Sequence, residues 1–112
     1  MKEQTGPPLV GVRVLDLGTR VAAPFAATLL ADFGAEVIKV ELPKTGDFMR
    51  TIGPFADGYS LFWAVEGRGK KSITLDLRRP EGQALLKRLV ALADVVVENF
   101  QPGTLESWGL GY

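Results

Sequence analysis

Val12-Arg13-Val14-Leu15-Asp16-Leu17 and Glu36-Val37-Ile38-Lys39-Val40 are two mainly apolar runs with the composition of β-strands. The segment between them has apolar residues at helical spacing, namely Phe25, Ala26, Leu29, Leu30 and Phe33. It also has a proline suited to a first helical turn, Pro24, and a glycine suited to a left-handed helix end, Gly34. A strand that leads directly into a helix N-terminus brings backbone N–H groups and the positive helix end together, which favours an anion. The stretch therefore predicts a strand–helix–strand unit with a turn at Gly18 that suits a phosphate-bearing ligand.

The rest of the chain continues the alternation of strands and helices. The expected elements are a long loop at 41–58, a helix at 59–66, a strand at 72–77, a helix opening at Pro80, a strand at 94–98 and a short helix at 104–110. The run at 94–98 is continuously apolar, which is typical of a strand covered on both faces.

This alternation predicts an α/β fold, a Rossmann-like parallel sheet with flanking helices and right-handed crossovers. Ligands of such sheets bind outside the carboxyl ends of the strands. We therefore expect the loops that begin at Gly18, Glu41, Arg78 and Asn99 to meet at one edge of the sheet.

Length and composition restrict the possible functions. The 112 residues suffice for about one domain, which we place at 9–112 after a flexible lead at 1–8. Thirteen basic and thirteen acidic residues cancel, so neither nucleic acid nor an anionic membrane is an expected partner. The chain has no cysteine or histidine, which argues against disulfides and against a metal site. No apolar run approaches the roughly 18 residues of a membrane span, and no signal peptide is visible, so we expect a cytoplasmic protein.

Covalent catalysis has few candidates in this sequence. Without cysteine, histidine or a Gly-x-Ser-x-Gly motif, only carboxylates remain as nucleophiles. Asp16 and Asp76 lie in strand patterns and Asp47 lies in the long loop, where aspartate is a common turn residue. Structural roles are therefore the favoured interpretation for all three.

Several segments, in order and with consistent spacing, resemble the N-terminal region of family III CoA-transferases. They are 9–17, the Ala23-Pro24 turn, 30–41, Gly46-Asp47, 70–77, Val96-Val97-Glu98-Asn99-Phe100-Gln101-Pro102-Gly103 and Gly109-Leu110-Gly111. This is the carnitine dehydratase and bile-acid-inducible protein F group, which also includes formyl-CoA transferase and α-methylacyl-CoA racemase. The match extends over nearly the whole chain from Leu9 onward.

The resemblance implies an enzyme that moves CoA between carboxylic acids through acyl-aspartyl intermediates, or, in the racemase branch, one that inverts the carbon next to the thioester. It also implies that 9–112 is the N-terminal, CoA-binding part of a larger domain and that the catalytic acid lies outside this chain. Family members form dimers of interlinked chains. A homodimer, or completion by the remaining polypeptide, is therefore expected, with acyl-CoA and a carboxylic acid as substrates.

The resemblance also assigns candidate CoA-binding residues, at three loops. An arginine in a loop can be merely solvated, and an apolar residue near a strand end can belong to the core, so each assignment has a structural alternative. The candidates are Arg20, Val21 and Ala22 after the first strand, Leu75 and Arg78 after the third, and Asn99 and Phe100 after the fourth.

Two positions depart from the family pattern. Ser107 stands where many members have an arginine that reaches the nucleotide, and Leu42 stands where some have another basic residue. Lys70 and Lys71 are candidate replacement cations for the phosphates of CoA, although a run such as 68–71 is more often a solvated surface.

Two other classes of function remain open. A non-catalytic dinucleotide-binding module would place Glu41 on the ribose, but only Gly18 of the Gly-x-Gly-x-x-Gly fingerprint is present. An interaction module would instead pair an exposed sheet edge with a partner chain.

Overall fold

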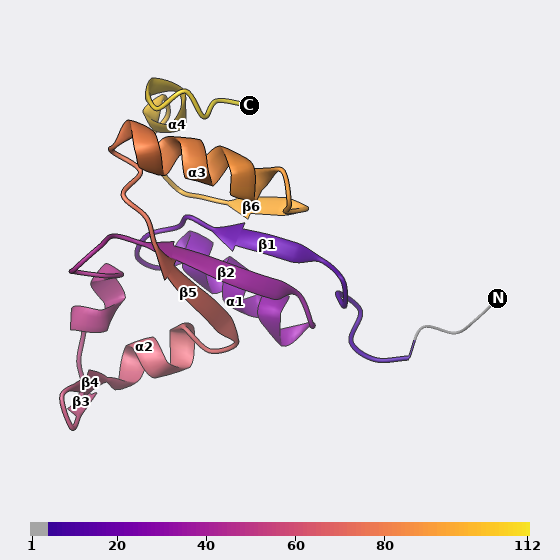
Figure 1. Ribbon diagram of the computed structural model, residues 1–112. Coiled ribbons are helices and arrows are strands. Elements are labelled where there is room, and N and C mark those ends of the chain that lie inside the picture. Colours follow the sequence, from indigo (N-terminus) through magenta and orange to yellow (C-terminus); the bar gives the residue numbers. More distant parts are fainter. Residues whose placement is uncertain (1–4) are drawn as a thin grey trace.

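The computed structural model describes residues 5–112, with strands and helices alternating along the chain (Figure 1). The elements are β1 (Arg13–Asp16), α1 (Ala22–Asp32), β2 (Glu36–Glu41), the 3-10 helix η1 (Phe48–Thr51), β3 (Phe55–Ala56), β4 (Tyr59–Ser60), α2 (Leu61–Glu66), β5 (Lys70–Thr74), α3 (Pro80–Val90), β6 (Val95–Val97) and α4 (Thr104–Ser107). The predicted helix end at Gly34 is confirmed, because its φ of 103° is in the left-handed region.

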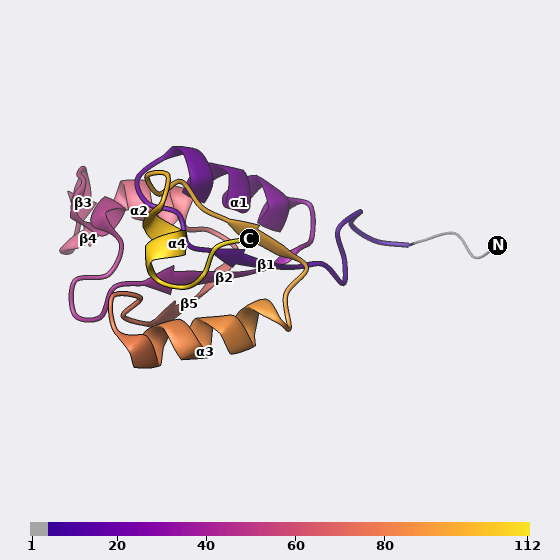
Figure 2. The ribbon, with the colours of Figure 1, turned by 90° about the horizontal axis from the view of Figure 1, so that it is seen from above.

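The main sheet has four parallel strands in the order β5-β2-β1-β6. The chain first builds outward from β1 to β2 and β5, and then crosses back to place β6 on the other side of β1. The helices α1 and α3 lie on opposite faces of the sheet (Figure 2). The predicted Rossmann-like fold is confirmed, and the reversal of strand order places a switch point between β1 and β6.

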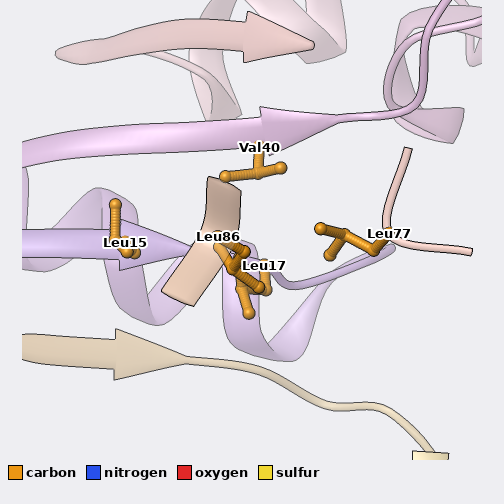
Figure 3. Packing of buried hydrophobic residues seen from close by; sticks show 5 residues of the cluster. All are labelled: Leu15, Leu17, Val40, Leu77 and Leu86. Carbon is orange, nitrogen blue, oxygen red and sulfur yellow. The ribbon is translucent and has the colours of Figure 1, made fainter. Parts of the chain in front are cut away.

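The alternation along β1 and β2 divides the core between the two faces. Leu15, Leu17, Val40, Leu77 and Leu86 form the cluster beneath α3 (Figure 3). The cluster beneath α1 consists of Val14, Ala27, Ala35 and Val37. Because α1 covers the second face, the polar residues of β1 and β2 that share the parity of Val14 and Val37 are also buried, and they become important for the site.

The predicted strand at 72–77 is shifted in the structure, where β5 runs from Lys70 to Thr74. Its pairing with β2 ends at Thr74 opposite Glu41, and β2 also ends there. Beyond that point the chain leaves the sheet, and Leu77 packs into the cluster beneath α3. The alternation of 72–77 thus indicates which side chains face the core, although only 72–74 of this segment pair as a strand.

The prediction that the strand at 94–98 is covered on both faces is wrong. The strand β6 pairs only with β1, and Val95 and Val96 are 38% and 39% exposed. The sheet ends at β6 within residues 5–112, so an apolar strand stands at its edge. Such an edge is what the interaction-module hypothesis requires, and its pairing with another chain stays a prediction.

Three further segments differ from expectation. The segment 41–58 is not a structureless loop, because it contains η1 and β3. The helix expected at 59–66 begins only at Leu61, after β4, and Ser60 caps it by accepting a hydrogen bond from the Trp63 N–H. The last helix, α4, ends at Ser107. Gly109 follows with a φ of 70°, which an ordinary helix cannot continue through.

The predicted lead at 1–8 lies partly outside the described residues. Within the described part, Pro7 lies against Gly34, where a β-carbon would approach the Pro7 Cβ to 2.5 Å. No helix in residues 5–112 is both long enough and apolar enough to cross a membrane.

Candidate functional site

A cleft of about 450 Å³ lies at the carboxyl edge of the sheet. It is lined by the loops that follow β1, β2, β5 and β6, which confirms that these four loops meet. The lining residues are Leu17, Gly18, Thr19, Val40, Glu41, Leu42, Thr45, Gly46, Asp47, Phe48, Thr51, Leu75, Leu77, Arg78, Phe100 and Trp108.

The walls of the cleft are mainly apolar. Phe100 and Trp108 meet edge to face with ring centroids 5.5 Å apart, and both pack against the cluster beneath α3. Leu75 both lines the cleft and packs on this cluster, so a place in the core is compatible with a place in the cleft wall. An apolar slot with few charged groups at its mouth is typical of sites that accept a ring system with a polar extension.

The seven predicted binding residues divide into three groups in the structure. Leu75, Arg78 and Phe100 line the cleft. Arg20 and Asn99 do not line the cleft but contact residues that do, since Arg20 contacts Phe48 and Asn99 hydrogen-bonds to Thr19. Val21 and Ala22, at the start of α1, are exposed and do not line the cleft.

Arg78 is a cation at the mouth of the cleft that is paired with Asp76 but still largely exposed. Its Nε donates to the Asp76 carboxylate at 3.1 Å, and its side chain remains 69% exposed. The hydrogen bonds from Arg78 lower the pKa of Asp76, so the acid stays ionised. A phosphate at the mouth would share Arg78 with this half-buried carboxylate.

Arg20 has an unusual backbone conformation. Its φ of 61° is left-handed, which is uncommon for a residue with a β-carbon. The guanidinium carbon lies 4.3 Å from the centroid of the Phe48 ring, a cation–π contact between the loop after β1 and η1. A cation is thus held over an aromatic wall of the cleft.

Four buried charged side chains form a network behind the cleft, on the face of the sheet that α1 covers. The Lys39 ammonium is 2.8 Å from Asp47 and 3.5 Å from Asp16, and the Lys70 ammonium is 2.8 Å from Asp16. All four side chains are at most 3% exposed. Within residues 5–112, no buried side-chain nitrogen or oxygen lacks a hydrogen-bond partner. Buried charges persist only when paired and hydrogen-bonded in this way.

Gly18 connects this network to the rim of the cleft. Its N–H donates to Asp16 at 2.8 Å, and its carbonyl accepts from Lys39 at 2.6 Å. A β-carbon at Gly18 would lie 2.6 Å from Ala23 Cβ and 2.8 Å from Pro24 Cδ. Only glycine therefore fits this close approach of the turn to α1.

Glu41, a buried residue that lines the cleft, forms an ion pair with the partly exposed Arg50. Its carboxylate accepts from Arg50 Nε at 2.7 Å, from Arg50 Nη2 at 2.8 Å, from the Asp47 N–H at 2.7 Å and from the Ser72 hydroxyl. Burial raises the pKa of Glu41, but these hydrogen bonds outweigh it and lower the pKa to about 2. Arg50 in turn stacks on Trp63, 4.3 Å from the ring centroid.

Acidification is expected to reveal the contribution of Glu41 to stability. Its pKa is depressed in the folded chain, so its contribution is complete above the ordinary value of 4.5 and is lost as the pH falls toward about 2. The size is about 2–3 kcal/mol after allowing for the exposure of Arg50. Urea unfolding of the wild type and Glu41→Gln from pH 7 to pH 2.5 measures it. The stability difference between the two should shrink as the pH falls, and a constant difference would contradict the assignment.

The structure argues against Lys70 and Lys71 as replacement phosphate-binding cations. Lys70 is buried against Asp16 and the Pro24 carbonyl, and burial lowers its pKa despite the hydrogen bond from Lys70 to Asp16. Lys71 pairs with Glu36 at the amino end of the sheet, away from the cleft. Ser107 offers no substitute, because its hydroxyl donates to the Thr104 carbonyl.

Sequence reasoning missed four residues at or behind the cleft. Phe48 and Trp108 line it, Lys39 holds its rim from behind, and Asp47 has a larger role than a turn residue. A signal for Lys39 was available, because a lysine on the inward parity of an otherwise apolar strand needs a buried partner. No comparable local signal marks Phe48 or Trp108.

Comparisons with known proteins show which family the chain resembles. The family model described as CoA-transferase family III matches residues 9–112. A succinyl-CoA:D-citramalate CoA-transferase from Chloroflexus aurantiacus is 61% identical over 114 residues, and the match covers 100% of this chain and 28% of that protein. The human succinyl-CoA:glutarate CoA-transferase is 49% identical, with 94% of this chain and 24% of that protein covered.

Solved structures extend the similarity to three dimensions. A CAIB/BAIF family protein from Brucella suis superimposes with a TM-score of 0.87 at 45% identity, covering 96% of this chain and 30% of that one. The chain therefore spans less than a third of the length of these curated and solved relatives.

Proposed function

The chain belongs to CoA-transferase family III, and we propose that residues 9–112 form the N-terminal, CoA-binding portion of an enzyme that transfers CoA between carboxylic acids. The observation that carries this proposal is the cleft at the carboxyl edge of the sheet. Its apolar walls suit the adenine ring of CoA, and Arg78 at its mouth, with Arg20 nearby, suits the phosphates.

The proposed binding residues have distinct tasks. Leu75 and Phe100 pack against the base, and Arg78 donates to a phosphate in place of part of its contact with Asp76. Arg20 supplies a second cation from above Phe48. Asn99 holds the loop after β1 by hydrogen-bonding to both the N–H and the carbonyl of Thr19. Val21 and Ala22 do not line the cleft, so the family resemblance alone supports them as CoA contacts.

We propose that the acyl-aspartyl chemistry is performed by a carboxylate outside this chain. The two carboxylates that line the cleft, Glu41 and Asp47, are each held by a cation and by a backbone N–H. Such carboxylates are stabilised as anions and are poor nucleophiles. The reaction would therefore be completed by further polypeptide of the enzyme, in a homodimer as the family resemblance implies.

Relatives named for succinyl-CoA suggest the first donor to test. A dinucleotide-binding module is disfavoured, because the carboxylate of Glu41 that would bind the ribose is buried against Arg50 and Ser72. A racemase is also disfavoured, since the curated relatives described above are named CoA-transferases.

Calorimetric titration with CoA tests the proposed site. We expect the chain to bind CoA and Arg78→Ala to weaken binding by about fivefold, because an exposed arginine gives a modest, salt-screened contact with phosphate. Arg79→Ala is the matched control, since Arg79 is the next residue and does not line the cleft. Equal affinities of Arg78→Ala and the wild type would remove Arg78 from the site, and no binding by the wild type would contradict CoA binding by this chain.

A further inference from the structure

The loop after β1 and the helix η1 are separate in sequence, yet both contribute to one contact at the cleft, the stack of Arg20 on Phe48. Arg20 keeps its left-handed backbone in that contact, with a φ of 61°. A residue with a β-carbon holds such a conformation only where its surroundings impose it. The question is which group imposes it.

The first constraint on Arg20 acts on the two residues before it. The Gly18 peptide groups are held by Asp16 and Lys39, and Thr19 is held through both its N–H and its carbonyl by the Asn99 side chain. These hydrogen bonds therefore fix the direction in which the backbone enters Arg20.

The second constraint acts on Phe48. Asp47 caps η1 by accepting from the Met49 N–H at 2.8 Å through one carboxylate oxygen. Its other oxygen pairs with Lys39 Nζ at 2.8 Å. The start of η1, where Phe48 lies, is thus attached to the same ammonium group that holds the Gly18 carbonyl.

We propose that Lys39 is a positioning residue that aligns Arg20 with Phe48. Among residues 5–112, its ammonium is the single group that bonds to both parts, at 2.6 Å to the Gly18 carbonyl and 2.8 Å to Asp47. It is 1% exposed and does not line the cleft, so it acts through these neighbours. Its β2 position opposite Asp16 and its salt bridge there, at 3.5 Å, fix where the ammonium can lie. The proposal itself concerns alignment, and only its consequence for affinity rests on the proposed CoA site.

Nuclear magnetic resonance can observe the alignment directly. A guanidinium above an aromatic face is shielded by the ring, so the Arg20 Nε–H proton should resonate upfield, and Phe48→Leu should abolish that shift. Asp47→Asn keeps a side-chain oxygen to cap η1 but loses the ion pair with Lys39. We expect Asp47→Asn to remove most of the upfield shift. We expect Lys39→Met, which loses the bonds to both Gly18 and Asp47, to remove all of it.

The matched control is Lys71→Met, the same substitution at an exposed lysine paired with Glu36 at the other end of the sheet. It should leave the Arg20 resonance unchanged. An unchanged resonance in folded Asp47→Asn would overturn the proposal, as would an equal loss in Lys71→Met. If Lys39→Met fails to fold, Asp47→Asn decides alone.

A double-mutant cycle connects the alignment to binding. If Asp47→Asn weakens CoA binding because Arg20 is misplaced, its effect should largely disappear in an Arg20→Ala background. We expect a loss of about tenfold in the wild-type background, the scale of one hydrogen bond to a charged group. Additive losses would show that Lys39 does not act through Arg20. Absence of CoA binding by the wild type would count against the proposed function, and the resonance of Arg20 would still test the alignment.

Discussion

Replacing Asp16 with alanine is expected to destabilise the chain by about 3–5 kcal/mol. Natural domains are stable by about 5–15 kcal/mol, so this loss would remove a large share of the chain's stability. No other single carboxylate among the described residues bonds to two buried lysines and to a rim N–H at once.

The physical reason is the charge that Asp16 leaves behind. Its carboxylate is fully buried between Lys39 and Lys70. Alanine would leave Lys39 paired only with Asp47, Lys70 with the Pro24 carbonyl but no carboxylate, and the Gly18 N–H without its acceptor. The cost of unpaired buried charge exceeds the value of an ordinary salt bridge.

Chemical denaturation followed by circular dichroism measures the effect. Asp32→Ala is the matched control, because Asp32 pairs with Arg68 while both side chains stay well exposed, so its loss should be small. Asp16→Asn keeps an acceptor for the Gly18 N–H and should fall between the two. Equal destabilisation by Asp16→Ala and Asp32→Ala would contradict the structural role of the network.

Gly82→Ala is the second large expected effect, a destabilisation of about 2–4 kcal/mol. Gly82 is buried in the first turn of α3, where a β-carbon would lie 2.0 Å from the Asp76 carbonyl oxygen. The carbonyl belongs to the backbone and the β-carbon is attached rigidly to the backbone of α3, so α3 or the 76–78 loop must move. Since Arg78 belongs to that loop, the CoA affinity should fall as well.

The sign of this prediction distinguishes packing from helix propensity. Alanine favours a helix over glycine by about 1 kcal/mol, so propensity alone predicts that Gly82→Ala stabilises the chain. Ala84→Gly, at an exposed position of the same helix, measures that propensity. Thermal unfolding of both variants provides the comparison. A higher melting temperature for Gly82→Ala would show that α3 does not approach Asp76 this closely.

Much of the fold was accessible from local patterns. The periodicity of 25–33, the glycine at Gly34 and the amphipathic run after Pro80 identified α1 and α3, because helix formation depends on residues three or four apart. The parallel topology followed from the alternation of elements, and with it the meeting of four loops at one edge. Leu75, Arg78 and Phe100 were assigned to that edge by family resemblance, and the structure places them in the cleft.

Other features could not be predicted, because they depend on which strands neighbour each other. The exposure of β6 follows from its place at the sheet edge, and its apolar sequence resembles that of a covered strand. Lys70 lies in a run typical of a solvated surface, yet the register of β5 against β2 buries it beside Asp16.

By itself, the sequence determined how the strands of the main sheet alternate with α1 and α3 and the edge at which their loops gather, since both depend on short-range periodicity and on the connectivity of parallel strands. The tertiary structure alone decided that Asp16, Lys39, Asp47 and Lys70 form one buried charge network behind the cleft. These residues are separated by up to 54 positions, and only the strand register and the cover provided by α1 bring them together. Out of water, each charge then requires a partner that no local pattern reveals.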